Sequence, residues 1–302
     1  MDKVYRFGEF AKNLGCKVLY NEIMSRHTTF KTGGAADVFI TAENTEDLIN
    51  LCRKAKNCGI PVFTLGNGSN VLVSDNGIRG AVITLGGKFK DVRIEGGEGI
   101  ACGAGASLAS VCTFAQKNRL TGMEFAWGIP GSAGGAAFMN AGAYGHSISE
   151  VAASCEYVTA AGAQGSVGKD ELDFGYRHSA FSGGGYIITV LHLKLKNGDP
   201  DRIAAQMAEL LGRRKAKQPL DMPSAGSVFK RPQGNFAGKL IEECGLKGRS
   251  VGDAAVSEKH AGFIVNKGNA TSRDITELIG IIKDTVYSHT GVQLECEIKF
   301  VG

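Results

Sequence analysis

The alternation of apolar and polar residues predicts a strand–helix–strand–turn–strand unit over residues 36–85. The stretch "ADVFIT" alternates in the way that is typical of a strand. Residues 44–59, "NTEDLINLCRKAKNCG", then place apolar side chains on one helical face, with Gly59 as a stop and Pro61 beyond it. "PVFTLG" and "AVITL" complete the unit as strands, separated by a glycine-rich turn at 66–70.

Two further regions follow along the chain. Strands are expected near 90–95, 100–103, 150–160 and 186–195, with a helix near 107–118 and a long glycine-rich connection between them. A helix should then begin at Pro200 with Asp199 as its cap, and Thr271 with Asp274 resembles a capping box before another helix. "LECEIKFVG" is expected to form a closing strand. The pattern predicts an α+β protein in three parts, 1–86, 87–197 and 198–302.

Charge and cysteine content narrow the class of protein. A net charge of +4 from scattered basic residues does not indicate a nucleic-acid partner. The eight cysteines form no C-x-x-C pair and are best explained as reduced thiols of a cytosolic protein. The N-terminus is too charged for a signal peptide, and the uncharged run 125–149 is too rich in glycine for a membrane span. We therefore expect a soluble cytoplasmic enzyme or binding protein without membrane insertion.

Glycine is the unusual residue of this composition. It makes up 43 of 302 residues, about twice the usual share of about 7%. An excess of this kind indicates tight turns, or backbone that lies close to something other than a side chain.

The first glycine-rich loop, "LGNGSNVL" at 65–72, follows a predicted strand. Successive N–H groups in such a turn form an anion-binding nest, and Ser69 and Asn70 add polar side chains. The loop fails the dinucleotide template because Val71 replaces its third glycine, and no G-K-[S/T] phosphate loop is present. A simple hairpin-like turn between strands is the alternative.

The second loop, "GIPGSAGGA" at 128–136, combines a proline with Ser132 and small residues. It is expected to open a short helix whose free N–H groups face an anion. Tight helix–sheet packing would explain the small residues equally well. Two such loops without a metal motif nearby favour a pyrophosphate, and hence a dinucleotide held outside the Rossmann pattern.

Several motifs in order then show a family resemblance over nearly the whole chain. They are "TTFKTGGAAD", "LGNGSNVLVSD", "GMEFAWGIPGSAGGAAFMNAGAYG", "FGYRHSAF", "KQPLDMPSAGSVFKRP", "GKLIEECGLKG", "VSEKHAGFIVN" and "LECEIKFVG". Together they resemble the UDP-N-acetylenolpyruvoylglucosamine reductases, in the shorter form of that family. The resemblance implies two FAD-binding subdomains of the p-cresol methylhydroxylase type, 1–86 and 87–197, and a smaller α+β substrate-binding domain, 198–302.

The resemblance also implies a reaction and a cofactor. NADPH would reduce non-covalently bound FAD, which would pass hydride to the enolpyruvyl group of UDP-N-acetylglucosamine enolpyruvate. The product, UDP-N-acetylmuramate, is a precursor of bacterial peptidoglycan, and no obligate protein partner is evident. The residues implied in FAD binding are Gly66, Asn67, Gly68, Ser69, Asn70, Gly128, Ile129, Gly131, Ser132, Gly135, Ala136 and Gly142.

Three residues match the catalytic positions of the family. Arg177 would clamp the substrate carboxylate, for which a planar guanidinium is suited, and Glu297 would stabilise the enolate. Ser227 would donate the proton that quenches it. Without the motifs, Arg177 would be read as a surface ion-pair residue, Glu297 as a solvated strand residue and Ser227 as a turn residue. No G-x-S-x-G elbow surrounds Ser227, which argues against a hydrolase nucleophile.

Other positions are less specific. Lys217 matches a family position that meets the UDP, while Arg214 and Lys230 are further candidates for substrate contact. His178 stands where the family often has aspartate, and Cys296 where many relatives have proline. His260 is a weaker candidate for the substrate side. A non-catalytic nucleotide-sugar binder and a covalent-flavin oxidase of the same fold remain the alternatives, and no metal site is expected.

Overall fold

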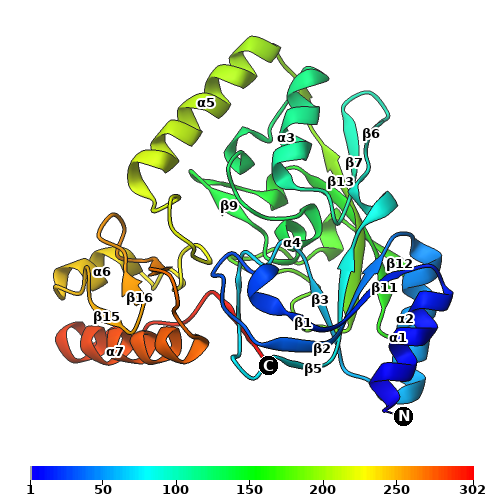
Figure 1. The fold of residues 1–302 in the computed structure, drawn as a ribbon. Helices are drawn as coiled ribbons and strands as arrows, with labels where there is room; N and C mark the ends of the chain where they lie inside the picture. The colour runs from blue at the N-terminus through cyan, green and yellow to red at the C-terminus, as the bar shows by residue number, and fades with distance from the viewer. Residues whose placement is uncertain (1) are drawn as a thin grey trace. The chain divides into compact units, whose positions relative to one another are not determined.

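The computed structural model describes residues 2–302, which group into two compact units (Figure 1). Both units are discontinuous in sequence. The first takes in the chain up to Tyr20, Val38–Asn67 and Gly80–Arg213, and the second Asn21–Asp37, Gly68–Arg79 and Arg214–Gly302. The three-part division expected from the sequence is finer than this and stays a prediction.

A four-stranded sheet and two helices form around the predicted strand–helix–strand unit. α1 and α2 lie side by side (Figure 1). α2 begins where Asn44 accepts a hydrogen bond from the N–H of Asp47 at 3.0 Å, and ends at Gly59 with a φ of 59°. The predicted unit is confirmed, whereas α1 and β1 were not predicted. The sheet has the order β1-β2-β5-β3; the elements are α1 (Lys3–Asn13), β1 (Lys17–Ile23), β2 (Ala35–Ala42), α2 (Thr45–Cys58), β3 (Val62–Leu65) and β5 (Ile78–Leu85).

A five-stranded antiparallel sheet forms the other layer of the first unit. Its order is β12-β11-β13-β7-β6, and Leu191 of β13 pairs with Cys155 on one side and Cys102 on the other. All three are fully buried, as expected for the central strands of a sheet. The predicted strands and helix are confirmed, and β12 is an addition. The elements are β6 (Val92–Glu95), β7 (Gly99–Gly103), α3 (Leu108–Lys117), β11 (Ala152–Thr159), β12 (Gln164–Gly168) and β13 (Tyr186–Lys194).

Short elements occupy the predicted glycine-rich connection and its surroundings. α4 packs against β13 and starts where the sequence indicated a short helix. The short elements are η2 (Gly87–Lys90), η3 (Glu124–Ala126), α4 (Ala133–Phe138), η4 (Ile148–Glu150), η5 (Lys169–Glu171), and the strand pairs β8 (Leu120–Thr121) with β14 (Lys196–Asn197) and β9 (Gly142–Ala143) with β10 (His146–Ser147).

The predicted start of α5 (Pro200–Lys217) is confirmed. The carboxylate of Asp199 accepts the N–H groups of Asp201 and Arg202 at 2.9 and 3.1 Å. These bonds lower the pKa of Asp199, because they favour its charged form.

In the second unit, α7 packs against a small antiparallel sheet and against α6. α7 buries Ile275, Leu278, Ile279 and Ile282 in its core, at the spacing of one helical face. Burial of each such side chain contributes roughly 1.5–3 kcal/mol. The elements are η1 (Met24–Arg26), α6 (Ala237–Glu243), β15 (Ser250–Val251), β16 (Ala254–Val256), β17 (Ile264–Asn266) and α7 (Ser272–Thr290).

The C-terminal strand differs from the prediction. β18 covers only Lys299–Val301 and pairs in parallel with β4 (Val71–Val73). Residues 295–298 are not part of a regular strand, although Cys296 forms an isolated bridge with Phe229. The predicted closing strand is therefore confirmed for Lys299–Val301 and is wrong for residues 295–298. Within residues 2–302, no helix combines the length and the apolar character needed to cross a membrane.

Candidate functional site

The two glycine-rich loops converge in the first unit. A Cβ atom built on Gly66 would lie 2.6 Å from the Oγ atom of Ser132, a distance that real Cβ contacts essentially never show. Gly66 does not need a left-handed backbone, so its lack of a side chain serves this close approach. The loop is also no hairpin, since β3 pairs in parallel with β5 and β4 pairs with β18. The two loops predicted to bind a pyrophosphate thus approach each other at Gly66 and Ser132.

The start of α4 does not offer the free N–H groups expected from the sequence. The N–H groups of Ala133 and Gly134 donate to the carbonyls of Ala106 and Ala104 at 2.8 and 2.9 Å. The Oγ of Ser132 accepts the N–H of Gly135 at 3.2 Å. This expectation is wrong, because the neighbouring chain at 104–106 takes the first donors. Any role of this loop in FAD binding must rest on its shape and on groups outside that first turn.

From Gly68 onward, the first loop belongs to the second unit. Gly68 has a φ of 63°, and a Cβ there would lie 2.0 Å from the carbonyl oxygen of His27. The carbonyl of Gly68 accepts the N–H of Thr29 at 3.0 Å. The side-chain amide of Asn70 donates to the backbone carbonyl of Glu297 at 3.3 Å. This unit therefore brings Asn70, predicted to bind the cofactor, into contact with Glu297, predicted to be catalytic.

Arg177 occupies a strained position in the first unit. Its φ is 55°, a left-handed conformation that costs a non-glycine residue roughly 1–2 kcal/mol. The turn around it is closed by backbone hydrogen bonds in both directions between Gly175 and His178, at 3.1 and 3.3 Å. Asn140 donates to the carbonyl of Gly175 at 2.9 Å and anchors the turn. Strain held by surrounding bonds is a feature of functional positions.

His178 has a definite role in this turn. Its Nε2 lies 3.2 Å from the carboxylate of Asp173, a residue that also has a positive φ, 44°. His178 thus pairs with an acidic residue five positions earlier. The guanidinium of Arg177 lies 5.1 Å from the ring centroid of Tyr176, within cation–π range.

Ser227 and Glu297 lie on adjacent segments of the second unit. Ser227 forms an isolated bridge with Phe263, and Phe229 forms one with Cys296. The N–H of Glu297 donates to the carbonyl of Val228 at 2.7 Å. The segment that carries Ser227 is therefore held between residues 262–263 and 295–297. The Oγ of Ser227 donates to the carbonyl of Phe229 at 3.2 Å.

Cys296 is half-buried in this arrangement. Burial raises the pKa of its thiol, and the positive charge of Lys283 opposes that shift. The cysteine therefore keeps its proton at neutral pH.

The predicted substrate cations differ in their surroundings. Lys230 lies 3.1 Å from the carboxylate of Glu295 in an exposed ion pair. Arg214 is buried and donates to the side chain of Gln218 at 3.3 Å. Lys217 is exposed at the end of α5. Lys217 is thus the most accessible of the three for a phosphate group.

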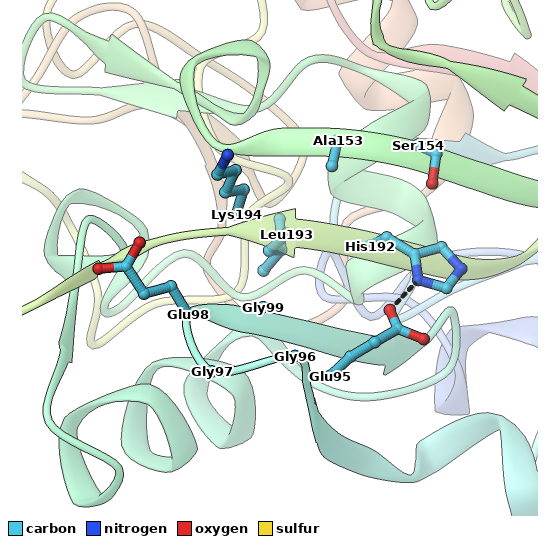
Figure 2. A pocket seen from close by; sticks show the side chains of 10 residues that line it. All are labelled: Glu95, Gly96, Gly97, Glu98, Gly99, Ala153, Ser154, His192, Leu193 and Lys194. Carbon is cyan, nitrogen blue, oxygen red and sulfur yellow. Dashed lines mark hydrogen bonds and ion pairs between the residues drawn. The ribbon is translucent and has the colours of Figure 1, made fainter.

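A pocket of about 460 Å³ lies on the five-stranded sheet, away from every residue predicted for the site. Figure 2 shows the ring of His192 on β13 directed at the carboxylate of Glu95 on β6, two strands away in the sheet, at 2.5 Å. Its other ring nitrogen lies 3.0 Å from Glu156. Because the two carboxylates approach opposite ring nitrogens, they cannot bind one ion together with the ring.

Among residues 2–302 no cluster of acidic, histidine or cysteine side chains suits a metal ion.

Comparison with known proteins identifies the family. Residues 218–301 match the profile of the UDP-N-acetylenolpyruvoylglucosamine reductase C-terminal domain, and residues 36–168 that of an FAD binding domain. The reductase of Clostridium tetani is 49% identical over 96% of this chain and 94% of its own length. The chain belongs to the UDP-N-acetylenolpyruvoylglucosamine reductase family. It is an FAD-dependent oxidoreductase of peptidoglycan precursor synthesis.

Structural comparison agrees with this membership. The reductase from Thermus caldophilus superposes with a TM-score of 0.82 at 36% identity, over 95% of this chain and 99% of that chain. A berberine bridge enzyme variant matches with a TM-score of 0.51 at 14% identity over 64% of this chain, which shows a shared fold alone. The predicted fold class, an FAD-binding fold with a smaller C-terminal domain, is confirmed.

Membership in the reductase family and the match to an FAD binding domain give this chain a cofactor, FAD. That the convergent loops bind it stays a prediction. Sequence reasoning missed the residues that support this site. Asn140 and Asp173 brace the turn of Arg177, and Gly262 faces Ser227. Each of these is a single residue without a recognisable sequence motif. Only the folded structure shows what it contacts.

Proposed function

We propose that this chain reduces the enolpyruvyl group of UDP-N-acetylglucosamine enolpyruvate to UDP-N-acetylmuramate, with NADPH as the reductant of non-covalently bound FAD. The similarity to reductases of that name over 96% of the chain carries the proposal. The match of residues 36–168 to an FAD binding domain supports the cofactor. The proposed place of this reaction is the bacterial cytoplasm.

The proposed reaction adds one hydride and one proton, that is two electrons and two protons in total, across one carbon–carbon double bond. FAD, when bound, supplies hydride chemistry. Hydride adds to the outer carbon of the enolpyruvyl group, and the electron pair of the double bond moves toward the carboxylate. The inner carbon then takes a proton, which leaves a saturated lactyl ether. The residues of the chain must therefore stabilise negative charge and deliver one proton.

Arg177 is the proposed carboxylate clamp. Its guanidinium stays charged at all physiological pH values and can bind two carboxylate oxygens at once. The bonds from Gly175 to His178 fix the backbone that carries it. Such preorganisation makes a cation most effective where charge develops.

Ser227 is the proposed proton donor, and Glu297 the proposed partner of the enolate. A serine hydroxyl is a weak acid, so it can protonate only a strongly basic carbon. In the resting structure its proton is directed at the carbonyl of Phe229. It must rotate away from that carbonyl to reach substrate. Glu297 follows Cys296, the residue that bridges to Phe229, and its N–H donates to the carbonyl of Val228.

Cations are proposed to hold the substrate diphosphate. Lys217 is exposed and therefore suited to a phosphate contact. Arg214 and Lys230 are assigned a secondary role, because each already contacts a polar neighbour, Gln218 and Glu295 respectively.

An anaerobic absorbance experiment tests the proposal. The flavin of the purified protein should bleach with NADPH and recover its colour when UDP-N-acetylglucosamine enolpyruvate is added. Ser227→Ala should bleach normally but fail to turn over, because the proton donor is lost. Ser250→Ala, at an exposed serine of the same unit, is the matched control and should behave as wild type. A protein that never binds FAD, or a Ser227→Ala variant with normal turnover, would contradict the assignment.

A further inference from the structure

We propose that His260 is a positioning residue for the proton donor Ser227, and that it acts through the backbone amide of Gly262 while its imidazole is neutral. The inference rests on the function proposed for Ser227. It concerns four residues that all belong to the second unit: Ser227, Gly238, His260 and Gly262.

Gly262 is the point where histidine and serine approach one another. A Cβ built on Gly262 would lie 3.0 Å from Cε1 and 3.1 Å from Nδ1 of His260, and 3.3 Å from the Oγ of Ser227. The two side chains therefore flank the space that any side chain at position 262 would occupy. On the other side, a Cβ on Gly238 would lie 3.0 Å from the same Cε1 atom. The imidazole is seated between two glycines.

Backbone hydrogen bonds connect this seat to Ser227. The carbonyl of Gly262 accepts the N–H of Val228 at 2.9 Å, and Ser227 itself bridges to Phe263. The N–H of Gly262 donates to Nδ1 of His260 at 3.1 Å. The same peptide segment that holds the serine is thus held by the histidine ring. A ring contact with Phe263, 5.0 Å between centroids, fixes the ring from its side.

The hydrogen bond from Gly262 defines the protonation state of the histidine. Nδ1 can accept an N–H only when it carries no proton, so the ring must be the neutral Nε2–H tautomer. A proton added at Nδ1 would place two donors against each other. The bond would then be lost, and with it one of the contacts that holds residues 262–263 against Ser227.

The surroundings favour the neutral ring. Burial lowers the pKa of His260 below its ordinary value of 6.5 against the opposing effect of a hydrogen bond with its own backbone, and the charge of Lys247 acts in the same direction as burial. Glu242 acts in the opposite direction, but it forms an ion pair with Lys247 at 2.6 Å. The other nearby charges are exposed: Lys239 and Glu243 pair with each other on α6, and Glu258 and Lys259 lie on the loop of the histidine itself.

Lys230 is a poorer candidate for this role. It is close to Ser227 in sequence, but its ammonium group lies 3.1 Å from the carboxylate of Glu295 in an exposed pair. No comparable contact joins Lys230 to Ser227 in the described part of the chain. His260 is the titratable side chain that shares a contact point with the serine.

Two substitutions separate positioning from packing. His260→Asn keeps an acceptor at the place of Nδ1 but does not titrate, whereas His260→Leu removes the acceptor at similar size. Single-turnover reoxidation of pre-reduced flavin by the enolpyruvyl substrate, measured between pH 5 and 8, reports the step that needs Ser227. Flavin reduction by NADPH in the same samples is the internal control.

The expected results are distinct. His260→Leu should slow reoxidation roughly 10- to 100-fold, as displacement of a reacting group by about 1 Å does, and leave flavin reduction unchanged. Wild type should lose reoxidation rate only when the pH falls through the lowered pKa of His260, which lies below the ordinary value of 6.5, while His260→Asn should retain most of the rate and lack this acid limb. Unchanged reoxidation in His260→Leu, or the same acid limb in His260→Asn, would overturn the proposal.

The experiment also distinguishes the two levels of inference. If Ser227→Ala reoxidises at the wild-type rate, the function assigned to the serine is wrong and the positioning role is overturned with it. If Ser227 is required and both His260 variants behave as wild type at every pH, only the role of the histidine is wrong. Should His260→Leu fail to fold, the pH profile of His260→Asn decides alone.

Discussion

Arg177 combines an unfavourable backbone with a proposed chemical role. Its φ of 55° would suit glycine better than arginine, because a Cβ atom crowds the carbonyl in the left-handed region. The turn from Gly175 to His178 nevertheless holds the residue there. Such a conflict between local preference and structure is typical of positions kept for function.

We predict that Arg177→Gly separates stability from activity. The free energy of unfolding should stay the same or rise by up to about 1 kcal/mol, since relief of the left-handed strain offsets the added flexibility of glycine. Reoxidation of the flavin by substrate should be lost with the guanidinium. Urea unfolding and single-turnover kinetics measure the two effects.

The chain offers a matched control for this variant. Arg119 is also an arginine with a positive φ, 61°, but it is exposed and belongs to no predicted site. Arg119→Gly should change stability in the same way and leave the kinetics unaltered. A clear loss of stability in Arg177→Gly alone would show that its guanidinium supports the fold.

At the scale of elements, the start of α7 shows how two distant segments complete one helix. The Oγ1 of Thr271 accepts the N–H of Asp274, and the carboxylate of Asp274 accepts the N–H of Thr271 in return. The carboxylate of Asp75 accepts the two N–H groups between them, those of Ser272 and Arg273, at 2.8 and 3.1 Å. All four N–H groups that this helix start leaves without internal partners are therefore satisfied.

We predict that Asp75→Ala destabilises the protein by about 1 kcal/mol, because two of these N–H groups lose their acceptor. Gly280→Ala on the same helix should instead stabilise the protein. Nothing lies within 4 Å of a Cβ at that position, and alanine favours a helix interior by up to about 1 kcal/mol over glycine. Urea midpoints of the two variants provide the measurement. A urea midpoint of Asp75→Ala equal to that of wild type would contradict the assigned role of Asp75.

The elements also show what a sequence can reveal. Local chemistry identified the caps Asp199 and Thr271, and periodicity identified α2 and the central strands, because these signals depend on neighbours in sequence. Asp75 as a cap for α7 was not predictable, since the two are about 200 residues apart. The end of the chain was predicted as one long strand, but pairing partners exist only for Lys299–Val301 and a bridge at Cys296.

The same limit applies to the candidate site. Motifs predicted roles for Arg177, Ser227 and Glu297, which stay predictions, yet the structure was needed to place Gly262 and His260 beside Ser227. The prediction of free N–H groups at the start of α4 was wrong, because those N–H groups donate to the carbonyls of Ala104 and Ala106. Local sequence cannot show which distant backbone takes a donor.

At the scale of the whole molecule, the cysteines are mostly protected. All eight are free, and five are buried. Burial raises the pKa of Cys102, Cys112 and Cys155 to about 12. For Cys16 and Cys52 it raises the pKa to about 11. Since the thiolate is the reactive form, these groups should be inert in the native protein.

We predict that a disulfide reagent at pH 8 modifies at most three thiols of the native protein, those of Cys58, Cys244 and Cys296. Unfolding in guanidinium chloride should make all eight reactive. Absorbance of the released chromophore counts both sets. Rapid modification of four or more thiols before unfolding would contradict the burial described for the other five.

The pairing of β4 with β18 has a consequence for the order in which the protein can be made. Val71–Val73 leave the ribosome well before their partners Lys299–Val301, which lie more than 200 residues later in the sequence. The second unit therefore cannot complete this contact until Lys299–Val301 have been made, and until then Val71–Val73 remain an unpaired strand edge. Deletion of Lys299–Val301 would leave that edge exposed, and with it a template for association between chains.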